Sequence, residues 1–128
     1  MADFEADKKQ STLLVLFIPS ANRYGRSFSK KEQDQWVRRA LQVLGEMMGG
    51  ATAFPRGLGV WRDDAQKGKL VWDKPVLIQC YTDDATLEQH AMGLRDFLFE
   101  MGTTTSQGAV GFVIDRDYYE INFPFAGD

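Results

Sequence analysis

The sequence has little cysteine, histidine or proline: its 128 residues include one Cys, one His and four Pro. A single cysteine, Cys80, excludes an internal disulfide framework and a multi-cysteine zinc site. A single histidine, His90, leaves little material for a Ser-His-Asp triad or a two-histidine metal site. We therefore expect no metal and no cofactor. The longest uninterrupted apolar run, Leu13 to Ile18, is far shorter than the roughly 20 residues that a membrane helix needs.

The first ten residues are polar and contain no apolar stretch. They predict a flexible N-terminus, no secretory signal and a cytoplasmic location. Residues 11–128 are expected to form one domain, because a chain that is 44% hydrophobic and of this length can bury its own core.

Basic residues are scarce in the second half of the chain. Residues 1–64 carry a net charge of +2 and residues 65–128 a net charge of −5. A duplex-binding protein usually shows a basic domain, so this balance argues against duplex nucleic acid as a partner. One basic cluster stands out, and two interpretations of it stay open: a solvated face at the start of a helix, or a local anion site. Its members are Arg23, Arg26, Lys30, Lys31, Arg38 and Arg39.

Hydrophobic periodicity and turn residues predict the element order β-α-β-β-α-β. Residues 12–18 read as a buried strand, and Ser29 with Glu32 forms a capping box that starts a helix ending at Gly49. Residues 51–62 read as an edge strand, because Pro55 cannot donate to a ladder. Four further segments complete the pattern: a strand over 69–72 leading into 76–81, a helix from Asp83 or Asp84 to Gly102, and a last strand or pair of strand segments over 109–121.

This order is that of an α+β, ferredoxin-like sandwich, with a four-stranded antiparallel sheet and two helices on one face. The strands look apolar on both faces, so the face without helices needs a cover. We expect a homo-oligomer that covers it.

Seven residues are candidate ligand-binding residues. The loop after the first strand offers hydrogen-bond donors and forked guanidinium groups for an anion. A glycine-rich stretch, residues 49–61, could bring backbone amides close to a ligand, and aromatic side chains could stack on a base. The candidates are Ser20, Arg23, Arg26, Thr52, Trp61, Tyr81 and Glu120.

Two classes of function follow from these residues. The first is a small cytoplasmic binding module that takes an anionic, nucleotide-like ligand or a protein partner. The second is a small enzyme, a lyase or phosphodiesterase, that acts on a nucleotide-like substrate at a subunit interface. Asp115 and Asp117 leave room for a third, weaker hypothesis of a metal-dependent nuclease. No catalytic residue can be assigned from the sequence.

The segments Gly49-Gly50-Ala51-Thr52 and Gly57-Leu58-Gly59-Val60-Trp61 give the chain a resemblance to a group of small bacterial proteins of similar length. The resemblance extends from about Leu13 to Ile121. It implies a ferredoxin-like fold and no catalytic residue.

Overall fold

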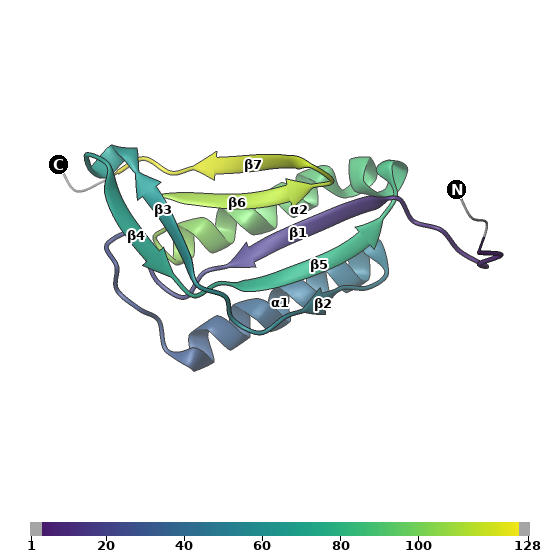
Figure 1. Ribbon diagram of the computed structural model, residues 1–128, viewed down its shortest axis with the longest axis horizontal. Coiled ribbons are helices and arrows are strands. Elements are labelled where there is room, and N and C mark those ends of the chain that lie inside the picture. Colours follow the sequence, from purple (N-terminus) through teal and green to yellow (C-terminus); the bar gives the residue numbers. More distant parts are fainter. Residues whose placement is uncertain (1–3, 126–128) are drawn as a thin grey trace.

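A computed structural model describes residues 4–125 as one sheet with two helices on one face and a separate hairpin at one end (Figure 1). Five antiparallel strands form the sheet in the order β2-β5-β1-β6-β7, and β3 pairs with β4 alone. The elements are β1 (Thr12–Ile18), α1 (Lys30–Met48), β2 (Thr52–Ala53), β3 (Gly59–Asp63), a 3₁₀ turn (Asp64–Gln66), β4 (Lys69–Asp73), β5 (Val76–Thr82), α2 (Asp84–Thr104), β6 (Ala109–Ile114) and β7 (Asp117–Asn122). Residues 4–11 contain neither helix nor strand.

Local sequence accounts for the ends of the first helix. The Ser29 side chain accepts a hydrogen bond from the Glu32 backbone N–H, and the Glu32 side chain accepts one from the Ser29 N–H, which confirms the capping box. Gly49 ends the helix in the left-handed conformation, at φ 96°, where glycine carries no steric penalty.

The core lies between the sheet and the two helices. Leu14, Leu16 and Ile18 alternate along β1 and are fully buried against the helices, which is the pattern expected of a strand. Other core side chains come from α1, β5, α2 and β6: Ala40, Leu44, Met48, Val76, Ile78, Cys80, Leu94, Phe97, Leu98, Met101 and Val110. Among the described residues, this core cluster takes no side chain from the β3–β4 hairpin, whose Val71 is buried outside it. Burial raises the pKa of the Cys80 thiol, as expected of a buried cysteine.

The sheet has one strand more than the four predicted. Asp115 adopts a left-handed conformation, at φ 55°, and the chain turns back so that Ile114 faces Asp117. The segment 109–121 therefore forms two paired strands, β6 and β7. Asp tolerates this conformation better than most residues, which favours a tight turn here.

The predicted edge strand over 51–62 is also divided. Only Thr52 and Ala53 pair with β5, and Gly59–Asp63 leaves the sheet to pair with β4. Pro55 lies between the two parts, where it interrupts the ladder because it has no N–H to donate. The second part is thereby free to form a hairpin across the open face of the sheet. Within residues 4–125, neither helix has the length and apolar character of a membrane span.

Candidate functional site

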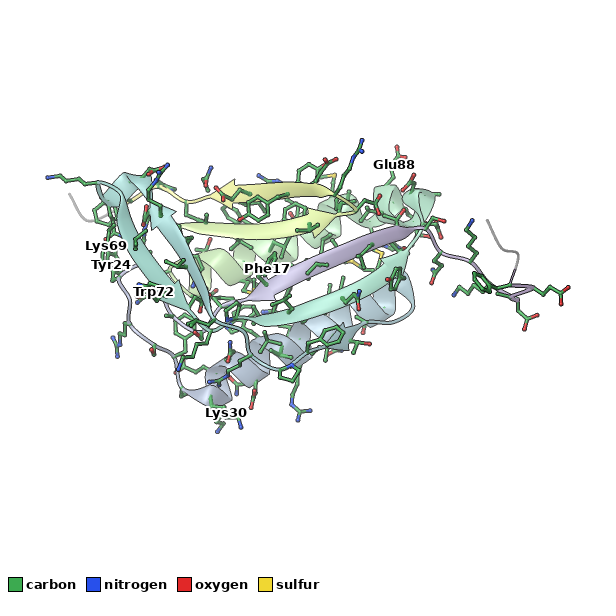
Figure 2. The ribbon with its side chains drawn as sticks, viewed as in Figure 1. Phe17, Tyr24, Lys30, Lys69, Trp72 and Glu88 are labelled. Carbon is green, nitrogen blue, oxygen red and sulfur yellow. The ribbon has the colours of Figure 1, made fainter. Side chains whose placement is uncertain are left out.

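A cavity of about 330 Å³ lies between the open face of the sheet and the β3–β4 hairpin. Phe17 projects from this face of β1 (Figure 2). The floor comes from alternate residues of four strands, and the segment before β3 and the hairpin supply the opposite wall. Its residues include Phe17, Leu77, Ala109, Gly111, Tyr118 and Glu120 on the sheet side and Leu58, Gly59, Val60, Trp61 and Asp73 on the hairpin side.

Tyr118 lies directly over Gly111. A Cβ atom at position 111 would come within 2.1 Å of the Tyr118 phenolic oxygen and 2.6 Å of its ring, closer than real Cβ contacts allow. Gly111 therefore gives the tyrosine ring a place against the backbone of β6. Gly111 and Glu120 face each other across the β6–β7 ladder, so the glycine, the tyrosine and the glutamate meet at one point.

Tyr118 and Glu120 form a hydrogen-bonded pair at the rim of the cavity. The Tyr118 Oη donates to Glu120 Oε2 at 3.0 Å. Burial, the Glu120 charge and this hydrogen bond raise the pKa of Tyr118 to about 12. The phenol is therefore protonated at neutral pH and holds the carboxylate in place.

Asp73 is the second carboxylate of the cavity, and it is anchored on one oxygen. Its Oδ1 accepts the Ser20 backbone N–H at 2.7 Å, the Ser20 hydroxyl and the Lys74 N–H at 2.9 Å. Ser20 Oγ in turn accepts the Lys74 N–H at 2.8 Å. Ser20, one of the predicted ligand residues, therefore fixes Asp73 at the base of the hairpin.

Trp61 supplies the hairpin's aromatic wall. Its ring reaches the loop before β6, where a Cβ atom on Gly108 would lie 2.4 Å from Trp61 Cη2. The indole is half-buried and lines the cavity. Gly108 thus allows the indole to pack against the sheet.

The charge of the cavity is negative. Its described lining residues include two carboxylates, Asp73 and Glu120, and no lysine or arginine. Among the ion pairs of residues 4–125, none involves either carboxylate. The two carboxylates can therefore attract a cationic ligand. A phosphate would meet two negative charges and, among the described lining residues, no lysine or arginine.

Arg23 lies outside the cavity and is only 4% exposed. Its Nε and Nη2 each donate to Asp63 at 3.2 Å, and its Nη1 donates to the carbonyls of Phe123 and Pro124. The sequence-based expectation that Arg23 offers its donors to an anion does not fit this geometry, because those donors already have partners.

The remaining predicted ligand residues are dispersed. Arg26 is exposed in the loop before α1, and its backbone N–H donates to Asn22 Oδ1. Thr52 is exposed in β2, and Tyr81 is 53% exposed on β5 opposite Leu13. Of the seven candidates, Trp61 and Glu120 line the cavity, and Ser20 contributes by hydrogen-bonding to Asp73, which also lines it.

Two polar side chains of the cavity, Tyr118 and Asp73, are absent from the sequence-based candidates. The spacing of Tyr118 from Glu120, two residues apart in a strand, places both on one face and is the signal that could have found it. Asp73 has no local sequence signal that points to the cavity. Its role depends on Ser20, which is distant in the chain.

The raised pKa of Tyr118 is testable by alkaline titration. The absorbance difference at 295 nm between the parent protein and Tyr118→Phe should stay flat until above pH 11. Because the folded pKa of about 12 exceeds the reference value of 10.0, the bond's contribution to stability is complete below pH 10 and is lost as the pH rises toward 12. A step in the difference near pH 10 would contradict the hydrogen-bonded geometry of Tyr118 and Glu120.

Neither a family model nor a curated protein matches the sequence. Two solved structures have a similar fold. A phage SAM lyase in complex with S-methyl-5'-thioadenosine aligns over 95% of this chain and 97% of its own, with a TM-score of 0.69 and 16% identity. A phage SAM lyase in the apo state aligns over 97% and 98%, with a TM-score of 0.66 and 15% identity. Across nearly its whole length, the chain is therefore similar in fold to phage SAM lyase.

Proposed function

We propose that this protein is a lyase that binds S-adenosylmethionine in the cavity between the sheet and the β3–β4 hairpin and releases S-methyl-5'-thioadenosine. The observation that carries the proposal is the charge of the cavity, where two carboxylates without lysine or arginine suit a sulfonium. The fold likeness to a phage SAM lyase, over almost all of both chains, supports the same ligand class.

The shape of the cavity is compatible with this ligand. A volume of about 330 Å³ is at the lower end of the range for small-molecule sites. Phe17, Trp61 and Tyr118 offer aromatic surfaces on which a purine could stack. Because the described residues that line the cavity include no lysine or arginine, the lyase alternative is favoured over a phosphodiesterase and over a module for an anionic ligand.

The chemistry requires no water and no external oxidant. The bond between the sulfonium and the methionine-derived γ-carbon breaks, and its electron pair stays on sulfur as a neutral thioether. The γ-carbon then gains a bond from the substrate's own carboxylate, or a double bond forms as the adjacent carbon loses a proton. Glu120, held by Tyr118, can orient the sulfonium in the first case and accept the proton in the second.

We also propose that a second copy of the chain covers the site. Tyr118 is 59% exposed, and Glu120 is exposed beside it at the rim of the cavity. A reacting centre works best when water is excluded, and one protomer leaves this pair open. The predicted homo-oligomer would close the rim and the open sheet face together.

Ligand binding tests this function directly. We expect S-methyl-5'-thioadenosine to raise the free energy of unfolding by about 2.7 kcal/mol at 100 times its Kd. S-adenosylmethionine should be converted to the thioadenosine without added metal, as followed by chromatography. Adenosine monophosphate is the matched control and should bind more weakly, because its phosphate meets two carboxylates.

Two results would contradict the proposal. The first is binding of adenosine monophosphate at least as tight as that of the thioadenosine. The second is the absence of both binding and turnover in a sample that sediments as an oligomer. A particle of 14.5 kDa in active samples would reject the second-copy proposal alone.

A further inference from the structure

The β3–β4 hairpin is attached to the rest of the protein at both of its ends. At its base, Asp73 is bound to Ser20, and the Gly57 N–H donates to the Pro75 carbonyl at 2.9 Å. At its tip, Asp63 and the 3₁₀ turn that follows it meet Arg23. Among the described residues, Val71 is the only buried apolar side chain of the hairpin and lies outside the main core cluster, so the polar attachments contribute much of what holds the hairpin over the cavity.

The tip attachment is a buried polar network. Arg23 and Asp63 form an ion pair whose side chains are each 4% exposed. Gln66 Nε2 donates to Asp63 Oδ2 at 2.6 Å and to the Arg23 carbonyl at 2.8 Å. Asp63 Oδ1 also accepts the Ala65 N–H at 3.1 Å. The tip is therefore held through both the backbone and the side chain of Arg23.

The same arginine binds the segment that follows β7. Its Nη1 donates to the carbonyls of Phe123 and Pro124 at 3.1 and 3.0 Å, and its guanidinium lies 5.0 Å from the centroid of the Phe125 ring. β7 is the strand that carries Tyr118 and Glu120. Arg23 thus joins the two elements that supply opposite walls of the cavity.

Trp61 connects this network to the cavity itself. A Cβ atom on Gly108 would lie 2.4 Å from the Trp61 ring, 3.1 Å from Asp63 Oδ2 and 3.2 Å from Arg23 Nη2. The indole and the ion pair therefore meet at the same glycine. A movement of the ion pair would move the hairpin's aromatic wall.

We infer that Arg23 and Asp63 are positioning residues that hold the β3–β4 hairpin, and with it Trp61, over the ligand cavity. The effect on ligand binding rests on the proposed function, whereas the effect on the hairpin does not. The hairpin pivots at its base when the pair is removed, and the five-stranded sheet stays intact. This assigns to Arg23 a role different from the anion site that its sequence context indicates.

Hydrogen exchange measured by mass spectrometry tests the inference without any ligand. In the double variant Arg23→Met/Asp63→Asn, amides of Gly59–Asp63 and Lys69–Asp73 should exchange at least about 10-fold faster than in the parent. Amides of β1 and β5 should keep their protection. Arg23→Met alone would leave the Asp63 carboxylate buried without a partner and could unfold the protein. The double variant removes both charges and avoids this problem.

Arg62→Met is the matched control. Arg62 lies on the same hairpin and pairs with Asp64, but both side chains are largely exposed, at 68% and 72%. Its loss should leave exchange in the hairpin unchanged. Unchanged exchange in the double variant would overturn the inference, and so would an equal loss of protection in β1 and β5, which would make the pair a general stabilising element.

Binding of S-methyl-5'-thioadenosine to the same three proteins separates the inference from the proposed function. We expect the double variant to bind at least about 10-fold more weakly and Arg62→Met to bind as the parent does. If the hairpin exchanges faster in the double variant but the parent protein does not bind thioadenosine, the positioning role is upheld and the proposed function is rejected. Full affinity with a loosened hairpin would overturn the role of the pair in binding.

Discussion

Replacing Glu120 by glutamine is expected to slow cleavage of S-adenosylmethionine by about 100-fold or more, the scale on which loss of one acid-base or charge-stabilising group commonly acts. The substitution keeps the size of the side chain and an oxygen that can accept the Tyr118 hydrogen bond. It removes the negative charge at the rim of the cavity. Release of S-methyl-5'-thioadenosine at saturating substrate, followed by chromatography, measures the effect.

Glu100→Gln is the control for this prediction. Glu100 is a half-exposed carboxylate on α2 that pairs with Arg39, and it is absent from the cavity lining. Its neutralisation should leave the rate unchanged. If Glu120→Gln kept more than half of the parent's activity, the carboxylate would have no part in the chemistry.

Replacing Gly111 by alanine is expected to slow cleavage of S-adenosylmethionine about as much as Glu120→Gln does, while the protein keeps its fold. The new methyl group would lie 2.1 Å from the Tyr118 oxygen, so the ring must move away from β6, and we expect this to displace its hydrogen bond to Glu120. A displacement of about 1 Å at a reacting centre can cost roughly 100-fold in rate. Overpacking should also lower the free energy of unfolding by about 1–3 kcal/mol.

An alkaline titration and a control variant identify the cause of that loss of activity. Alkaline titration should show the pKa of Tyr118 falling from about 12 toward its ordinary value. Gly45→Ala is the control, because Gly45 lies within α1 and an added Cβ would meet nothing within 4 Å beyond the adjoining backbone of its own helix. That change should stabilise the protein by about 0.5–1 kcal/mol. An active Gly111→Ala protein with an unchanged Tyr118 pKa would show that the glycine has no role in placing the ring.

Local sequence signals predict much of the fold. Three of these signals depend only on neighbouring residues, and each appears in the structure as expected: the apolar run Leu13–Ile18, the capping box at Ser29 and the helix end at Gly49. The separation of the β3–β4 hairpin from the main sheet was not predictable from local sequence, because it depends on tertiary contacts. Residues 59–63 and 69–73 read equally well as parts of the main sheet, and their departure from it depends on where the tip and base are attached.

The candidate site shows the same division. Trp61 and Glu120 stood out by residue type and strand position, and both line the cavity. Arg23 read as an anion-binding residue because its partner Asp63 is 40 positions away in the chain, and no local pattern connects them. Asp73 was overlooked for the same reason, since 53 positions separate it from Ser20. Long-range pairing decides whether a charged side chain faces a ligand or another part of the protein.

The separation of the hairpin from the hydrophobic core has a consequence for how such a chain can evolve. Substitutions in the hairpin that preserve its two attachments alter one wall of the cavity without disturbing the side chains on which folding depends. Ligand preference and stability can therefore drift independently among descendants of this sequence. A chimera that carries another hairpin of the same length between positions 59 and 73 would inherit a new recognition surface on an unchanged scaffold.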